Sequence, residues 1–239
     1  MTDLSFIIPC YNEEPHLKNN LEQVVTVLEH STYSYEVIII DDASTDKTPL
    51  IIDKFITLYN GHGNIVFIKH PENLGRGESV KNGLMAAKGT VAGFVDIDLS
   101  TSPWYILPLA AEIENGADIA IGSRMYKLKW KVFHRWILSK GYKVLVRIFL
   151  GTDLGDTETG CKFFKRERII PILSQVKDQR WFWDTEIMAR ALMANLKIVE
   201  VPTVFIRESL YSRVKIIRDS WQHLTNLTRL SWKIRKSLK

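Results

Sequence analysis

Short apolar runs alternate with helical patterns through the first half of the chain. Unbroken apolar stretches such as residues 37–40 are typical of strands that are buried on both faces of a parallel sheet. Helical patterns between consecutive runs predict a doubly wound α/β domain with a mainly parallel sheet. The five runs lie at residues 4–11, 35–43, 64–70, 90–98 and 117–124.

The segments between the first three runs show the helical spacing directly. In residues 44–59, Ser44 or Thr45 is expected to cap the helix. A further apolar run at residues 197–206 predicts another strand late in the chain. In residues 14–30, the apolar face consists of Leu17, Leu21, Val24, Val25 and Leu28.

Length and composition indicate a globular domain rather than a membrane-spanning chain. The 239 residues suffice for one large α/β domain, alone or with an appendage. Neither a run of about 18 apolar residues nor a signal peptide is present, so we expect a cytoplasmic protein without a transmembrane helix. Cys10 and Cys161 have apolar neighbours and no CxxC or histidine spacing, which predicts reduced thiols in the core.

Positive charge is concentrated in two segments. Residues 125–150 hold seven Lys or Arg and no acid, and residues 207–239 hold nine basic residues against two acidic ones. The remainder of the chain carries 16 basic and 25 acidic side chains, a net charge of −9. The overall charge of +5 is therefore the sum of two basic segments and an acidic remainder of the chain.

Two aspartates one residue apart, Asp96 and Asp98, follow the fourth apolar run. In an extended segment residues i and i+2 point to the same side, so both carboxylates are predicted to converge on one divalent cation. Carboxylates without thiolate or imidazole favour Mg²⁺ or Mn²⁺. Ligands of open parallel sheets bind at this carboxyl edge, where the second run also ends in Asp41 and Asp42. Taken alone, such a pair is more often a solvated turn.

Six motifs occur in a fixed order: IIPCYNEE, DDASTD, NLGRG, DIDLS, GSR and DTETGCKFF. In this order they resemble the nucleotide-sugar half of family 2 glycosyltransferases with the GT-A (Rossmann-like) fold. They are similar in kind to polyprenyl-phosphate glycosyltransferases, such as dolichyl-phosphate mannose synthases and dolichyl-phosphate glucosyltransferases. The resemblance covers residues 4–206. It implies a catalytic domain over residues 1–206 and a basic tail over residues 207–239.

The resemblance assigns a donor side to the site. Asp96 and Asp98 become ligands of Mg²⁺ or Mn²⁺ on the diphosphate. Asp41 is equally compatible with a helix cap or a turn. Ser100 stands where mannose synthases usually have Gln, which favours the glucosyltransferase-like or bacterial branches. The residues expected to hold the nucleoside, ribose and phosphates are Pro9, Tyr11, Glu13, Asp41, Asp42, Gly75 and Arg76.

The resemblance also assigns an acceptor side. Asp156 is expected to face the anomeric carbon, and Arg124, Arg135 and Ser139 to contact an acceptor phosphate. Asp184 and Glu186 are further candidates, although two acids that open a helix also complement its dipole. Nearby, the aromatic residues 181–183 are predicted to be core residues rather than a sugar platform.

The acceptor chemistry follows from protonation. A phosphate monoester, with a second pKa of about 6, is already an anion at neutral pH and needs no general base. We therefore expect inverting transfer of a hexose from a UDP-glucose or GDP-mannose type donor to a polyprenyl or dolichyl phosphate. One alternative is a family 2 transferase with a saccharide hydroxyl acceptor, which needs Asp156, Asp184 or Glu186 as base. The other alternative is a non-catalytic nucleic-acid-binding protein, but this alternative leaves the ordered motifs unexplained.

The two basic segments contain apolar residues at helical spacing. Basic amphipathic helices that contain Trp are typical of elements lying in a bilayer interface. This predicts a peripheral (monotopic) enzyme on the cytosolic face of a membrane, and the alternative is a buried helix with solvated basic flanks. A membrane-anchoring partner, a homo-oligomer or a truncated chain remain open. The spaced residues are Trp130, Phe133, Ile137, Val144 and Ile148, and Val214, Ile217, Trp221, Leu224, Leu227, Leu230 and Ile234.

Overall fold

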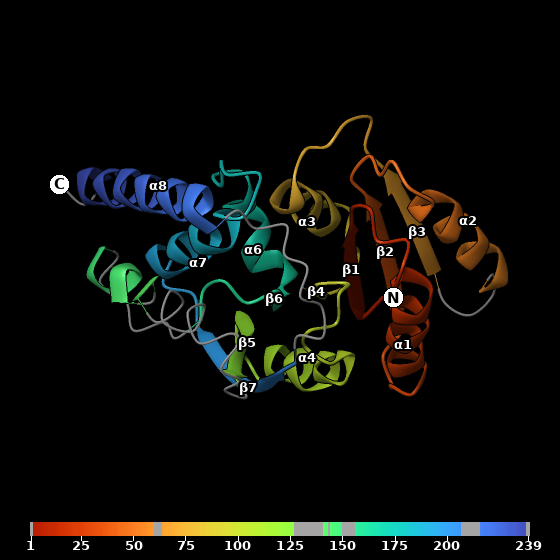
Figure 1. Cartoon of the computed structure of the whole chain (residues 1–239). Helices are drawn as coiled ribbons and strands as arrows, with labels where there is room; N and C mark the ends of the chain where they lie inside the picture. Colours follow the sequence, from red (N-terminus) through yellow and green to blue (C-terminus); the bar gives the residue numbers. More distant parts are fainter. Residues whose placement is uncertain are drawn as a thin grey trace.

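The computed structural model describes residues 2–59, 64–126, 141–142, 144–149, 156–206 and 216–237. Its centre is a seven-stranded sheet in the order β3-β2-β1-β4-β6-β5-β7, with helices on both sides (Figure 1). The strands are β1 Leu4–Cys10, β2 Tyr35–Asp41, β3 Asn64–Lys69, β4 Val91–Val95, β5 Ile119–Tyr126, β6 Cys161–Lys165 and β7 Ile198–Phe205. This architecture confirms the predicted α/β class and the strand–helix alternation.

The helices divide between the two faces of the sheet. Side chains of α1, α2 and α4 pack in one core cluster, and those of α3, α6 and α7 pack in the other. All five apolar residues predicted for the inner face of α1 are buried. The helices are α1 Leu17–Glu29, α2 Thr48–Leu58, α3 Arg76–Ala86, the 3₁₀ turn η1 Pro103–Tyr105, α4 Ile106–Glu114, α6 Arg166–Leu173, α7 Trp183–Met193 and α8 Ile216–Ser237.

Strand β6 is the one antiparallel member among the described strands, and the sequence did not predict it. It pairs with β4 on one side and β5 on the other. Its five residues include two lysines, so it lacks the long apolar run that marks the other inner strands. The pairing of Val95 with Cys161 places the residues before β6 at the carboxyl end of β4.

Two predicted boundaries were wrong. Helix α2 begins at Thr48, because the Asp46 carboxylate accepts the Thr48 N–H, while the Ser44 hydroxyl accepts the Asn12 N–H instead. Strand β5 continues through Tyr126, because it pairs with β7 over its whole length. The Gly-Ser-Arg motif at residues 122–124 was expected to end this strand and instead lies before its last two residues.

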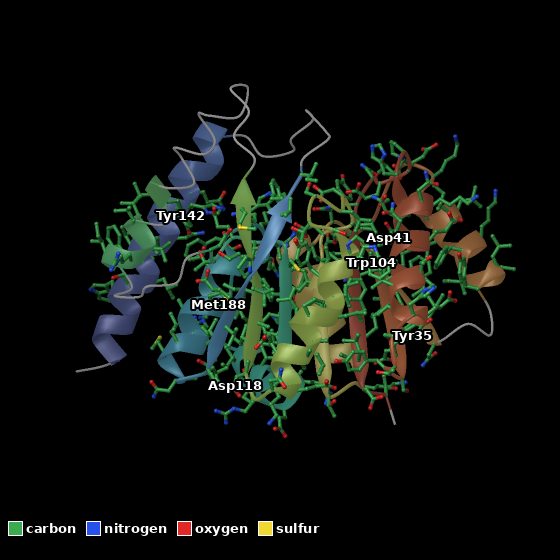
Figure 2. All side chains as sticks on the ribbon, turned by 90° about the horizontal axis from the view of Figure 1, so that it is seen from below. Tyr35, Asp41, Trp104, Asp118, Tyr142 and Met188 are labelled. Atoms are coloured by element: carbon green, nitrogen blue, oxygen red, sulfur yellow. The ribbon has the colours of Figure 1, made fainter. Side chains whose placement is uncertain are left out.

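The carboxyl ends of the parallel strands lie at one edge of the sheet. Figure 2 shows Asp41 at this end of the strands, with Tyr35 and Asp118, which lie at or next to strand starts, at the opposite end. Because β4 leaves β1 on the side opposite β2, the sheet has its topological switch point between β1 and β4. This is where ligands bind in doubly wound sheets.

Helix α8 packs on the protein along part of its apolar face. It lies beside α7 and the helical residues 144–149, at the end of the molecule opposite α2 (Figure 1). Leu227 and Leu230 are buried there, so a membrane-facing position is wrong for these two residues. Leu224 is half-buried, and the other residues spaced along the tail fall outside the described side chains. None of the described helices is long and apolar enough to cross a bilayer.

Candidate active site

The two aspartates after β4 lie in a turn. The Leu99 N–H donates to the Asp96 carbonyl at 3.0 Å, and Leu99 has a φ of 47°. The premise that Asp96 and Asp98 share an extended segment was therefore wrong, because the strand ends at Val95. Asp98 is exposed and its Oδ1 accepts the Ser100 N–H at 3.0 Å, whereas Asp96 is directed toward Arg76. Joint metal binding by the two carboxylates stays a prediction.

The donor set at this turn fits a hard divalent cation. No cluster of three or more His, Cys, Asp or Glu side chains suited to a metal occurs among the described residues. Mg²⁺ typically retains several waters and uses one or two carboxylates together with substrate phosphates. Asp96 and Asp98 supply the two carboxylates that such a site needs from the protein.

A glycine allows Asp96 its place. The Asp96 N–H donates to the Gly160 carbonyl at 2.8 Å, which fixes the turn against the residues before β6. A β-carbon at residue 160 would overlap the Asp96 carboxylate. Gly160, the last residue of DTETG, must therefore be small because the Asp96 carboxylate occupies the space beside it.

Arg76 links Asp96 to a buried charge cluster. Its Nη2 lies 2.7 Å from Asp96 Oδ1, and its Nη1 lies 2.6 Å from Asp184 Oδ2. The other Asp184 oxygen pairs at 2.5 Å with Nζ of Lys162, a residue of β6. Lys162 is a site residue that sequence reasoning missed; a lysine within an apolar strand directly after a motif was the available signal.

Burial and pairing act in opposite directions on this cluster. Burial alone would lower the pKa of Arg76, but the carboxylates of Asp184 and Asp96 outweigh it and the pKa is raised. Burial lowers the pKa of Lys162, and Asp184 offsets part of that effect. Removal from water raises the pKa of the partly buried Asp96 carboxyl, against the attraction of Arg76.

Arg124 and Asp156 form a two-pronged ion pair. Arg124 Nε and Nη2 each lie 2.7 Å from a different oxygen of Asp156. The guanidinium also lies 5.5 Å from the centre of the Phe205 ring. Asp156 is buried. The ion pair brings together two residues that the sequence analysis assigned to the acceptor side. Arg135 and Ser139 lie outside the described residues.

Glu186 lies apart from this arrangement. Its carboxylate accepts the N–H groups of Lys177 and Asp178 and pairs with Arg190 at 2.5 Å. Among the aromatic residues before it, Phe182 and Trp183 are buried as predicted. Trp181 is exposed, with its ring 5.7 Å from the Arg76 guanidinium, so the core prediction was wrong for Trp181.

On the donor side, Asp42 organises the glycine-rich loop. Its carboxylate accepts the N–H groups of Leu74 and Gly75, each at 2.9 Å, and contacts His70 Nδ1 at 2.8 Å. Gly75 has a φ of 100°, which L side chains rarely adopt. Asp41 Oδ1 accepts the Ser44 N–H, as a turn residue does. Its buried Oδ2 has no hydrogen-bond partner among the described residues.

A hollow of about 400 Å³ lies beside these residues. Pro9 is near the end of β1, and Tyr11 and Glu13 are half-buried in the loop that follows. The Glu13 N–H donates to the Thr48 hydroxyl at 2.8 Å, which ties this loop to α2. The hollow is lined by Ala43, Ser44, Lys69, His70 and Pro71.

Helix α8 contacts the residues before β6. His223 Nδ1 lies 3.2 Å from Glu158 Oε1, and the His223 ring packs edge-to-face against Tyr142 and Phe182. The Tyr142 hydroxyl lies 2.8 Å from the Thr185 hydroxyl, which also contacts Thr157. The C-terminal helix therefore supports the loop that carries Asp156.

Comparison with known proteins identifies the family. Residues 5–171 match the family described as Glycosyl transferase family 2. The chain belongs to this family. It is 31% identical over 235 residues to "Glycosyltransferase AglD" of Haloferax volcanii, covering 92% of this chain and 37% of that protein. It is 32% identical over 212 residues to "Dolichyl-phosphate beta-glucosyltransferase" of Dictyostelium discoideum, covering 83% and 64%.

The chain thus spans less than two thirds of either relative's length. Its fold is similar to that of glucosyl-3-phosphoglycerate synthase from Mycobacterium tuberculosis, crystallised with Mn²⁺, UDP and glucosyl-3-phosphoglycerate. The TM-score is 0.71 at 17% identity, covering 96% of this chain and 80% of that one. This likeness confirms the predicted GT-A class of fold.

Proposed function

We propose that the chain is a metal-dependent inverting glycosyltransferase that moves a hexose from a nucleoside diphosphate sugar to a polyprenyl phosphate. The family and the name of the Dictyostelium discoideum relative support this assignment. Its catalytic domain would comprise residues 1–206. The match to a glycosyltransferase family also favours an enzyme over the nucleic-acid-binding alternative.

One observation carries the choice of a phosphate acceptor. All three carboxylates that a hydroxyl acceptor would need as base are held by cations: Asp156 by Arg124, Asp184 by Arg76 and Lys162, and Glu186 by Arg190. Both oxygens of each carboxylate already accept hydrogen bonds from groups of the protein, so none is placed to take a proton from an acceptor hydroxyl. An acceptor phosphate is already ionised and requires only positioning and charge complementarity.

The donor would lie along the carboxyl edge of the sheet, from the end of β3 to the end of β4. The hollow beside Lys69 and His70 would receive the nucleobase, and the unpartnered Oδ2 of Asp41 could accept one of its N–H groups. Asp98 and Asp96 would hold Mg²⁺ or Mn²⁺, which neutralises charge on the departing diphosphate. Asp42 would keep the loop at residues 73–75 in place for close backbone approach.

We assign UDP-glucose as the donor, with GDP-mannose as the alternative. The assignment is supported by the printed name of the relative, a beta-glucosyltransferase, and by Ser100 in the position where mannose synthases usually have Gln. On the acceptor side, the Arg124 guanidinium would attract the phosphate, and Asp156 would hold the guanidinium in one orientation. Arg135 and Ser139 stay predicted contacts of that phosphate.

An anionic membrane surface is the proposed partner of the end that carries α8. Val144 and Ile148, one helical turn apart, are 55% and 64% exposed, and Trp232 is 64% exposed. Lys236 Nζ lies 5.3 Å from the Trp232 ring. The Ser231 hydroxyl bonds the Phe149 carbonyl, which joins the two helices that bear these side chains. Exposed apolar residues beside cations suit a bilayer interface.

A transfer assay tests the function. Purified protein is incubated with Mn²⁺, radiolabelled UDP-glucose or GDP-mannose, and a short polyprenyl phosphate, and labelled glycolipid and free nucleoside diphosphate are measured. We expect product from one donor, and a loss of about a hundredfold in Asp98→Asn at limiting Mn²⁺. Asp53→Asn, an exposed aspartate on α2, is the matched control and should retain activity. Absence of glycolipid with either donor would refute the proposal.

A further inference from the structure

We propose that Lys162 is a positioning residue of the active site, which acts through Asp184 and Arg76 to hold the Asp96 carboxylate in place. The inference rests on the proposed function, because it concerns the same nucleotide and metal site. It assigns a role to a buried cation that contacts Thr159 and Asp184.

Lys162 lies in the middle of the sheet. It belongs to β6 and pairs in register with Phe94 of β4, the strand that leads into Asp96. Its side chain is 0% exposed, and Nζ lies 5.7 Å from the Phe94 ring. A charge in such a place is costly unless it is paired and hydrogen-bonded. Its presence therefore requires partners.

The partners lead to the site by two routes. Nζ donates to Asp184 Oδ1 at 2.5 Å and also to the carbonyl of Thr159. Through Asp184 it reaches Arg76, and through the Thr159 carbonyl it holds the backbone beside Gly160, whose own carbonyl accepts the Asp96 N–H. One ammonium thus restrains both the side chain and the backbone of Asp96.

Arg76 is the shared member of the cluster. Its Nη1 serves Asp184, and its Nε and Nη2 serve Asp96 at 2.8 Å and 2.7 Å. Two cations and two carboxylates balance in charge, and each carboxylate has a donor. Without the Lys162 ammonium, both carboxylate oxygens of Asp184 would depend on N–H donors of Arg76. The Arg76 guanidinium would then move toward Asp184 and away from Asp96.

A purely structural ion pair predicts something different. In that case, loss of Lys162 lowers stability but leaves the affinity of the folded protein for its nucleotide unchanged. Competition for Arg76 predicts instead that affinity falls, and that neutralising Asp184 in the same protein restores it. The two explanations separate in a binding measurement made well below the melting temperature of each variant.

The test uses the full chain and titrates UDP, and in a second arm GDP, in the presence of Mn²⁺ by calorimetry. We expect Lys162→Met to weaken binding about tenfold or more, as loss of a supporting contact behind a metal ligand does. The double variant Lys162→Met/Asp184→Asn should return to within about threefold of the wild-type affinity, because Arg76 then serves Asp96 alone. Lys165→Met, which removes an exposed lysine of the same strand, is the matched control and should bind as wild type.

Wild-type affinity in folded Lys162→Met would overturn the inference, as would a double variant that binds as weakly as the single one. If Lys162→Met fails to fold, the double variant and Lys162→Arg are measured in its place. Weak binding by the folded double variant contradicts competition for Arg76. Binding by the double variant near the wild-type affinity supports the inference. A wild-type protein that binds neither nucleotide would contradict the proposed function itself, which distinguishes the two failures.

Discussion

At the scale of single residues, the site is built from side chains whose hydrogen-bonding capacity is used by other parts of the protein. Asp42 shows this clearly, because its carboxylate serves two backbone N–H groups and a histidine rather than standing open. Arg76 serves two aspartates at once. Much of what the motifs encode is therefore the shape of the loops at the carboxyl edge of the sheet.

Replacement of Asp42 tests this reading. Asp42→Ala leaves the Leu74 and Gly75 N–H groups without their acceptor, and a buried unsatisfied donor costs about 1–3 kcal/mol. We expect the free energy of unfolding, measured by urea denaturation, to fall by that amount, and nucleotide affinity to fall with it. An unchanged stability would show that the loop does not depend on this carboxylate.

The two cysteines give a second prediction. Cys10 and Cys161 are free and buried, as expected from the sequence, and burial raises the pKa of both thiols. Labelling with a thiol reagent near pH 8 should therefore be slow in the native protein and fast in denaturant.

The same raised pKa values affect stability. The folded state retains these protons at a pH above about 9, where the unfolded thiols have lost them, so the free energy of unfolding should decrease as pH rises through this range. In the labelling experiment, rapid reaction of the native protein with the thiol reagent would contradict the buried placement of Cys10 and Cys161.

At the scale of elements, the patterns that were predicted correctly are those fixed by burial. The inner face of α1 and the apolar strands β1 and β2 are specified by unbroken or periodic apolar residues, and these appear where they were expected. Strand β6 was missed because its residues become a strand only by lying between β4 and β5. Tertiary pairing of this kind leaves no local periodicity to read.

The same distinction holds for the site. The order of the motifs indicated which residues gather at the carboxyl edge, because parallel strands end together there. It did not indicate the turn at Asp96 or the role of Lys162, since both depend on the contact between Gly160 and Asp96 across two strands. Long-range contacts of this kind are set by sheet order, which no single motif carries.

Helix α8 offers a prediction at this scale. Leu227 is buried against α7, whereas Trp232 on the same helix is 64% exposed. We expect Leu227→Ala to lower the free energy of unfolding by about 2–5 kcal/mol, as core truncations do. Trp232→Ala should change stability little and reduce binding to vesicles. Equal stability effects for the two variants would contradict the packing of α8.

At the scale of the whole molecule, positive charge is concentrated in two segments of the chain. The basic segments at residues 125–150 and 207–239 hold half of the 32 basic residues, and the rest of the chain has a net charge of −9. The exposed Val144 and Ile148 lie in the first of these segments. The proposed membrane surface would therefore be bound by charge as well as by apolar contact.

Vesicle binding tests that arrangement. The protein should co-sediment with vesicles containing anionic lipid, and the bound fraction should fall as ionic strength rises, because cations near such a surface contribute about 1 kcal/mol each and are screened by salt. The double variant Val144→Glu/Ile148→Glu should bind less at every salt concentration. Leu58→Glu, an exposed leucine on α2, is the control and should bind as wild type. Binding to neutral vesicles that is insensitive to salt would contradict the charge-based account.

The central claim is transfer of a sugar to a phosphate that needs no general base. The most direct measurement compares a polyprenyl phosphate with the matching polyprenol as acceptors for radiolabelled glucose from UDP-glucose in the presence of Mn²⁺. The account predicts labelled lipid with the phosphate and none above background with the alcohol. Comparable labelling of the alcohol, or of a saccharide hydroxyl, would contradict it.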